Sequence, residues 1–290
     1  MKKSKQIATA LIGMVACVGI ICTLTANAEG FALKSKQTAV QTMTKEELRT
    51  EINRRFFDNG ENLTQIADEL GIKAYECLPL TSKETEMTED ERQKNAEMQI
   101  QFEKELTNEV RHRLFYKGDD LEQIADDLGI PIYENLPPIP IDLEAEESQE
   151  QGEEKIIIDS FPSKRADLPL ITAFDDLPSG YASYTQNYFD PKSDTISVDY
   201  TFTGTSFETN ERRVEVRLYR QRKSWAGSKE WEFVKKYSVT FFGSVSTTCI
   251  FNNLNNDDYV YCLGFNNVST QYNTGSTQIS GHAYISNSYD

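Results

Sequence analysis

Hydrophobic and polar positions repeat with two different periods along this chain of 290 residues, and the period changes near residue 155. Before that point, apolar residues recur every three or four positions, which is the spacing of one face of an amphipathic helix. After it, apolar and polar residues alternate, as they do in a strand with one buried face. The pattern therefore predicts helices in the N-terminal half and β-strands in the C-terminal half.

The helical pattern occurs twice, 58 residues apart, at residues 48–80 and 106–138. Each copy predicts an amphipathic helix, a glycine that ends it in the left-handed conformation, and a short second helix with a polar N-cap. Because one such hairpin leaves an apolar face uncovered, the two copies are expected to pack on each other or on a partner. The glycines and caps are Gly60 and Asn62 in the first copy, and Gly118 and Asp120 in the second.

The alternating pattern predicts six strands, separated by turns rich in Gly, Asn, Ser or Asp, and the apolar run 156–158 predicts a further first strand. Such a series is typical of an antiparallel sandwich. The expected fold class is thus α+β in separate domains, with duplicated helical hairpins followed by an antiparallel β-sandwich. The six runs are 196–203, 214–219, 231–241, 245–251, 259–265 and 278–286.

The predicted sandwich half contains one stretch that resembles a known family of domains. Residues 251–254, Phe-Asn-Asn-Leu, are followed by Asp-Tyr-Val-Tyr at 258–261. This resembles the strand, corner and tyrosine pattern of immunoglobulin- and fibronectin-type domains, and the resemblance implies an immunoglobulin-like sandwich.

The helical half contains a second stretch that resembles a known family. Residues 117–130 resemble the start of a LysM module, Phe57 and Phe115 stand where that family has a strand residue, and residues 133–136 could stand for its second helix. The resemblance implies a groove that binds N-acetylglucosamine polymers such as peptidoglycan. The residues placed at that groove are Gly118, Asp119 and Asp120 in the second copy, and Gly60, Glu61 and Asn62 in the first.

The same residues also resemble the first helix and turn of a helix-turn-helix, in which the next helix reads DNA. That helix would have to be residues 131–136, which carry no Arg or Lys and end at two prolines. The readings that stay open for the copies are a structural or protein-binding hairpin and a cell-wall glycan module.

The two halves of the chain also differ in net charge. Residues 29–153 carry 30 acids and 14 bases, a net −16, whereas residues 154–290 carry 16 acids and 13 bases, a net −3. An acidic surface is repelled by phosphate backbones and by anionic membranes. Nucleic acid is therefore excluded as an expected partner.

The N-terminus predicts export. Three lysines, an apolar run and Ala-Asn-Ala describe a signal peptide over residues 1–28, cleaved after Ala28, with an uncleaved anchor as the alternative. We expect the mature protein to be secreted or extracytoplasmic, at the envelope of a bacterium, without membrane insertion. The remaining predicted segments are a linker at 29–44, the two-copy repeat at 45–140 (copies 45–80 and 103–138), an acidic linker at 141–154 and the sandwich at 155–290.

Candidate chemistry is sparse. The only histidines, His112 and His282, are predicted to lie on a helix surface and in a strand, and no nucleophile, metal or phosphate-loop motif occurs. No catalytic residue, metal or cofactor is expected. An exported chain permits a disulfide between Cys249 and Cys262, although Cys262 has the opposite parity from its apolar neighbours, so the pairing is left open.

The two tryptophans suggest a sugar-stacking platform. Trp231 lies on an apolar strand face and is predicted to be core, whereas Trp225 lies in a turn and is the exposed candidate. The expected function is an exported binding or interaction protein without a catalytic site, which contacts protein or glycan at the cell envelope. The alternatives are a secreted glycan hydrolase with a carboxylate pair and a carbohydrate-binding sandwich.

Overall fold

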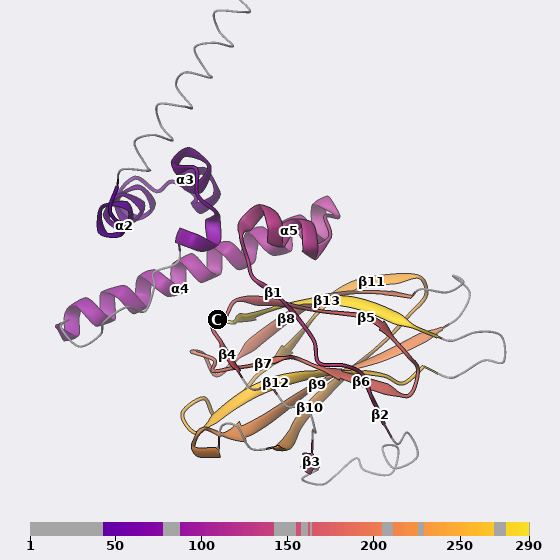
Figure 1. Cartoon of the computed structure of the whole chain (residues 1–290). Coiled ribbons are helices and arrows are strands. Elements are labelled where there is room, and N and C mark those ends of the chain that lie inside the picture. The colour runs from indigo at the N-terminus through magenta and orange to yellow at the C-terminus, as the bar shows by residue number, and fades with distance from the viewer. Residues whose placement is uncertain are drawn as a thin grey trace, which may run out of the picture. The chain divides into compact units, whose positions relative to one another are not determined.

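The structure is a computed structural model that describes residues 43–77, 88–141, 155–157, 162, 164–204, 211–225, 229–269 and 277–289. The chain forms two compact units, Met1–Cys77 and Leu78–Asp290. The predicted signal peptide lies outside the described residues, as does most of both predicted linkers. Figure 1 shows the helices and strands of each unit.

The first unit contains the first helical copy. Helix α2 (Lys45–Asn53) continues into the π-helix η1 (Arg54–Asp58), and α3 (Leu63–Leu70) is followed by the 3-10 helix η2 (Ala74–Cys77). Thr44 caps α2 in a capping box with Glu47, because each side chain accepts a hydrogen bond from the other residue's backbone N–H.

The second unit begins with the second copy and repeats that order of elements. Helix α4 (Glu89–Arg111) continues into the π-helix η4 (His112–Lys117), and α5 (Leu121–Leu128) follows. The predicted glycine ends are confirmed, since Gly60 and Gly118 have φ values of +67° and +77°. The predicted caps are confirmed as well, since the Asn62 and Asp120 side chains each accept a hydrogen bond from the backbone N–H three residues on.

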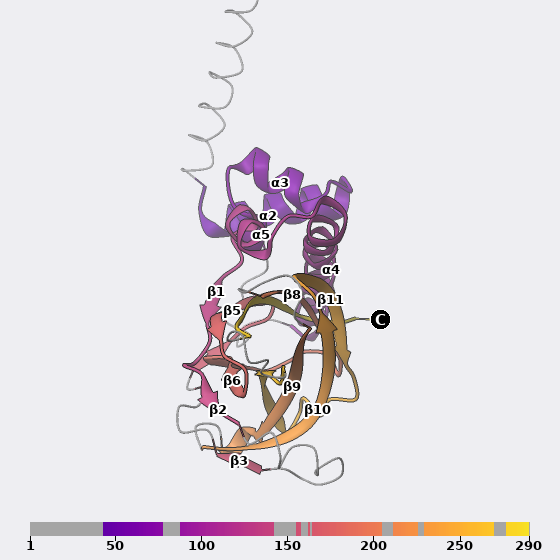
Figure 2. The ribbon, with the colours of Figure 1, turned by 90° about the vertical axis from the view of Figure 1, so that its right-hand side faces the viewer.

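The sandwich of the second unit consists of two facing sheets (Figures 1 and 2). The five-stranded sheet has the order β1-β5-β13-β8-β11. The second sheet has the order β2-β6-β12-β9-β10-β3, with β7 pairing β12 and β4 pairing β7. The strand bounds are β1 Ile132–Glu134, β2 Ile139–Pro140, β3 Lys155–Ile157, β4 Lys164–Ala166, β5 Leu170–Leu177, β6 Tyr181–Tyr184, β7 Asn187–Phe189, β8 Ile196–Gly204, β9 Arg212–Arg222, β10 Glu230–Phe241, β11 Ser244–Phe251, β12 Tyr259–Asn267 and β13 Ile279–Asn287.

All six predicted C-terminal strands are present, as β8 to β13. Residues 156 and 157 of the predicted apolar run lie in β3, which pairs with β10 over residues 155–157, while residue 158 lies outside the described residues. The pairing of β10 with β9 shifts register between Phe233 and Lys235, as at a β-bulge. The core lies between the two sheets, and its inward positions include Val214, Val216 and Leu218 of β9.

The connectivity is that of a jelly roll. The eight strands β5, β6 and β8 to β13 divide equally between the two sheets. One sheet contains β5, β13, β8 and β11 and the other β6, β12, β9 and β10, so that β5 and β6 enter opposite sheets. Immunoglobulin domains instead keep their first two strands in one sheet. The sandwich is thus observed, while the strand order differs from the expected immunoglobulin order. Tyr261 hydrogen-bonds the backbone of Asn255, six residues earlier in the chain.

The segment after α5 corrects one expectation. The LysM resemblance implies a helix at residues 133–136 and the helix-turn-helix resemblance one at 131–136, but β1 occupies Ile132–Glu134 and pairs in parallel with β5. The next strand, β2, pairs with β6 in the other sheet. Because Pro131, Pro137 and Pro138 flank this stretch, extended backbone is favoured over a helix.

Helix α4 contacts the five-stranded sheet through a row of polar side chains at four-residue spacing. Glu103 accepts hydrogen bonds from Asn287 (2.9 Å) and Tyr289 (2.7 Å), and Thr107 lies 3.1 Å from the Tyr284 hydroxyl. Arg111 forms an ion pair with Asp199 at 3.1 Å. The second helical copy and the sandwich therefore belong to one compact unit.

Burial raises the pKa of Asp199 above its ordinary value, although hydrogen bonds from Thr248 and Arg111 oppose that effect.

Within the described residues, no helix has the length and apolar character that a membrane span requires.

Candidate functional site

The turn after Gly118, predicted to be a glycan groove, is held together by side chains of its own copy. Arg113 of η4 donates hydrogen bonds to Asp119 (2.7 Å) and to Asp127 of α5 (2.5 Å). Burial alone would lower the pKa of Arg113, but the hydrogen bonds to these two carboxylates raise it above its ordinary value. Asp120 is the N-cap of α5.

The first copy contains the same arrangement at the same spacing. Arg55 forms ion pairs with Glu61 and with Glu69, the latter at 2.8 Å. The hydrogen bond from Arg55, with a second from Asn59, lowers the pKa of Glu61. Asn62 caps α3. Each predicted acidic or amide residue of the two turns thus has a partner within its own copy, and each turn acts first as a structural clasp between two helices.

The repeats also present an aromatic side chain at one equivalent position. Phe57 and Phe115 are 36% and 39% exposed, although both stand where the LysM resemblance implies a strand residue. Both lie in π-helices, η1 and η4, that continue the preceding α-helices, so neither residue lies in a strand. Tyr116, next to Phe115, is still more exposed and stacks on His112.

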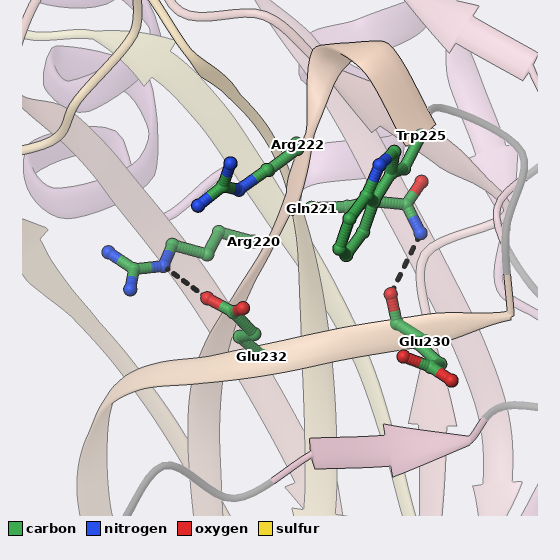
Figure 3. Close-up of a pocket in the computed structure, with 6 residues that line it drawn as sticks. All are labelled: Arg220, Gln221, Arg222, Trp225, Glu230 and Glu232. Atoms are coloured by element: carbon green, nitrogen blue, oxygen red, sulfur yellow. Dashed lines mark hydrogen bonds and ion pairs between the residues drawn. The ribbon is translucent and has the colours of Figure 1, made fainter.

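A pocket lies at the tip of the β9–β10 hairpin, at the predicted exposed tryptophan. It has an empty volume of about 260 Å³, which includes the open space at its mouth. Trp225 ends the 3-10 helix η5 (Lys223–Trp225) and is 52% exposed. Figure 3 shows the side chains that line it, which are Arg220, Gln221, Arg222, Trp225, Glu230 and Glu232.

The alternation of β9 explains how two arginines reach this pocket. Val214, Val216 and Leu218 face the core, so positions 220 and 222 continue the same face beyond the end of the apolar interior. Figure 3 shows both guanidinium groups projecting to the same side of the strand. The hairpin therefore places charged groups where its inward face meets solvent.

Hydrogen bonds hold several of these groups in place. Arg220 donates to Glu232 at 3.0 Å and lies 4.5 Å from the ring centroid of Tyr259. The Gln221 amide donates to the backbone carbonyl of Glu230 at 2.8 Å. The guanidinium of Arg222 lies 5.7 Å from the Trp225 ring, within the range of a cation–π contact. The pocket is thus a pre-arranged set of planar polar groups around one aromatic ring.

The second tryptophan has the predicted buried position. Trp231 is completely buried in a cluster on the outer face of the second sheet, together with Tyr184, Tyr219 and Cys262. Leu136, in the segment that connects β1 to β2, packs against this cluster.

The Cys249–Cys262 disulfide that the sequence left open is not formed. Cys249 and Cys262 are both free and buried, and so is Cys77. Cys249 lies in the core between the sheets, whereas Cys262 lies on the outer face of the second sheet. The opposite parity of Cys262 in β12 is the reason, since it directs that side chain away from the core that contains Cys249.

Sequence reasoning found Trp225 but not the polar residues around it. A signal was present, because the run Arg-Gln-Arg-Lys at 220–223 is the densest basic stretch of the sandwich half. Its strand parity placed two of these residues on the core-facing side. No group of three or more His, Cys, Asp or Glu residues in the described part of the chain could hold a metal ion.

Comparisons with known proteins give structural likenesses only. No protein-family profile matches the chain, and no curated protein matches it. A family 4 carbohydrate-binding module has a TM-score of 0.26 and 10% identity, covering 37% of this chain and 61% of that structure. A family 28 module specific for non-crystalline cellulose has a TM-score of 0.28 and 16% identity, covering 41% of this chain and 72% of that structure. A xylan-binding module of family 15 has a TM-score of 0.25 and 13% identity, covering 48% of this chain and 100% of that structure. At these values no site residue is carried from those proteins to this chain.

Proposed function

We propose that this chain is a carbohydrate-binding protein whose sandwich holds a sugar in the Trp225 pocket. The observation that carries the proposal is a tryptophan more than half exposed, in a pocket lined by arginine, glutamine and glutamate side chains. The face of an indole ring is electronegative and apolar, so it suits the C–H face of a sugar ring. The planar polar groups around it suit the hydroxyls at the rim of that ring.

The openness of the pocket determines how a sugar would be held. The volume of about 260 Å³ includes open solvent, so the Trp225 pocket is a shallow hollow and not an enclosed cavity. One sugar unit would therefore lie on the exposed ring of Trp225, and a longer chain would continue into solvent.

We propose that the Trp225 pocket binds a sugar without catalysing a reaction. The two carboxylates of the pocket, Glu230 and Glu232, are two positions apart on one strand, and Glu232 is paired with Arg220. A glycoside hydrolase needs two carboxyl groups on either side of the scissile bond. We further propose that the protein acts outside the cytoplasm, which it would reach by the predicted signal peptide.

Affinity gel electrophoresis tests this function. The full-length mature protein is run through gels that contain xylan, mixed-linkage glucan, galactan or polygalacturonate, beside the variant Trp225→Ala. Phe242→Ala is the matched control, because Phe242 is a 58% exposed aromatic residue at the next hairpin. We expect one or more polymers to retard the wild-type protein and the control, but not Trp225→Ala. Equal migration of all three proteins in every gel would contradict the function, and release of reducing ends would contradict the absence of catalysis.

A second candidate function belongs to the helical copies. We propose that they contact a protein or cell-wall glycan at the envelope, and the repeated exposure of Phe57 and Phe115 favours this role. A pulldown on purified peptidoglycan and on envelope proteins, with the double variant Phe57→Ser/Phe115→Ser, tests it. Retention that the double variant loses, with Trp225→Ala unaffected, supports the role; retention that is unchanged in the double variant opposes it.

A further inference from the structure

The hairpin tip that carries Trp225 differs in charge from the rest of the protein. Residues 220–232 contain four bases and two acids, a net +2, in a chain whose net charge is −16. The bases are Arg220, Arg222, Lys223 and Lys229, and the acids are Glu230 and Glu232. The exposed tryptophan therefore lies in a small basic region of an acidic protein.

Arg220 and Lys223 have acidic partners in the sandwich. Arg220 is paired with Glu232 at 3.0 Å, and Lys223 with Asp190 at 2.9 Å. Arg222 differs from them: within the described residues its guanidinium forms no ion pair, and its contact is with the Trp225 ring at 5.7 Å. Arg222 is also exposed. It is therefore a cation beside the aromatic platform whose charge no carboxylate of the described chain compensates.

The position of Arg222 suits an anionic group on a stacked sugar. A guanidinium presents a planar fork of N–H donors that matches a carboxylate or sulfate group. Figure 3 shows Arg222 across the pocket from Glu230, so an anion on the Arg222 side would lie away from that carboxylate. Glu232, the other acid, is already paired with Arg220.

We infer that the Trp225 pocket selects glycans whose sugars carry an anionic group, held by Arg222 while the ring stacks on Trp225. This inference rests on the proposed carbohydrate-binding function and narrows its ligand class. The acidic charge of the rest of the chain opposes the approach of a polyanion at long range. At about 0.15 M salt that repulsion is screened beyond about 8 Å, whereas a contact at the pocket is not.

Isothermal titration with two matched polymer pairs tests the inference. Polygalacturonate is compared with its methyl ester, which removes the carboxylate charge, and dextran sulfate with dextran; the full-length mature protein is used at 0.15 M salt. We expect at least tenfold tighter binding to one charged polymer than to its neutral counterpart. Which pair shows the difference distinguishes a carboxylate from a sulfate.

Variants separate the role of Arg222 from that of Trp225. Arg222→Gln is expected to lose at least tenfold in affinity for the charged polymer and to bind the neutral one like wild type, with Arg222→Lys in between. Trp225→Ala is expected to lose both. Arg213→Gln is the matched control, because Arg213 is an exposed arginine nine residues away on β9, roughly 30 Å along the strand. Thermal unfolding of each variant checks that the fold is intact.

The outcomes are distinguishable. Equal affinity for charged and neutral polymers, or wild-type affinity of Arg222→Gln for the charged polymer, overturns the inference while a loss in Trp225→Ala leaves the carbohydrate-binding function standing. Wild-type affinity of Trp225→Ala for every polymer, or no binding of any polymer by the wild-type protein, overturns both. A loss in Arg213→Gln equal to that in Arg222→Gln also overturns the inference, since the effect would then be one of general charge.

Discussion

The turn at Gly118 and the tip of the β9–β10 hairpin both place charged side chains beside an exposed aromatic residue, but those side chains have different partners. At the turn, Asp119 is bonded to Arg113 and Asp120 caps the next helix. At the tip, the Arg222 guanidinium forms no ion pair among the described residues and lies 5.7 Å from the ring of Trp225. Polar groups that satisfy each other hold a fold together, whereas a polar group left facing solvent beside an aromatic ring is available to a ligand.

The largest expected effect concerns the clasp of the second copy. Arg113→Met removes a mostly buried cation from two carboxylates, so we expect the free energy of unfolding to fall by about 2 kcal/mol. Urea unfolding measures this, with Arg92→Met as the control, because Arg92 and Glu89 form an exposed pair on α4 that contributes little. Glycan affinity should not change; a stable Arg113→Met protein with weakened glycan binding would show that the turn is a ligand site.

The next effect concerns the tip. Trp225→Ala should weaken glycan binding at least tenfold, which is about 1.4 kcal/mol. Its unfolding free energy should change by less than about 0.5 kcal/mol, because the side chain is largely exposed. Titration calorimetry and urea unfolding of one preparation measure both. A variant that is destabilised and still binds would mean that Trp225 is structural.

A smaller effect is expected at the N-cap. Asp120→Ala should cost about 1 kcal/mol, because the backbone N–H of Gln123 loses its acceptor. Asp120→Asn keeps an acceptor oxygen and should stay close to wild type. If both variants were equally stable and both lost affinity for peptidoglycan, the charge of Asp120 would serve a ligand and not the helix.

The smallest effect is a pH dependence in the first copy. The pKa of Glu61 is lowered in the folded state, so the Arg55–Glu61 interaction stabilises the fold above the ordinary pKa of about 4.5 and is lost as pH falls through the lowered value. Glu61→Gln should thus be less stable than wild type at pH 7, and the difference should shrink towards pH 3. Thermal unfolding across this range measures it, with Asp68→Asn on α3 as the control. A difference that stays constant with pH would contradict the clasp.

The local features of both helical copies could be predicted because they depend on neighbours in sequence. Gly60, Gly118, Asn62 and Asp120 were assigned from their positions relative to apolar residues, and the strands β8 to β13 from strict alternation. The parity argument for Cys262 was also local, and it gave the correct face.

Features that depend on distant parts of the chain were not predicted. Nothing near Ile132 indicates that β5, almost forty residues later, would take this segment as a parallel strand. The jelly-roll order likewise depends on which sheet each strand enters. The ion pairs of Arg113 required the fold, because its two partners lie 6 and 14 residues away.

The Trp225 site was predicted only in part. Exposure of the tryptophan followed from its place in a turn, but Glu230 and Glu232 reach the pocket because β10 pairs with β9. The equivalence of the two aromatic positions, Phe57 and Phe115, was visible in the sequence, whereas their exposure at the end of π-helices was not.

The two tryptophans allow the most direct test of carbohydrate binding at the tip. The chain contains only Trp225 and Trp231, one exposed and one buried, so a ¹⁵N-labelled protein gives two indole N–H signals that a Trp225→Phe variant assigns. During titration with the polymer that binds best, the Trp225 signal should shift and saturate while the Trp231 signal stays in place. Saturation of binding with no movement of the Trp225 signal, together with shifts of the backbone amides of residues 118–120, would contradict the account.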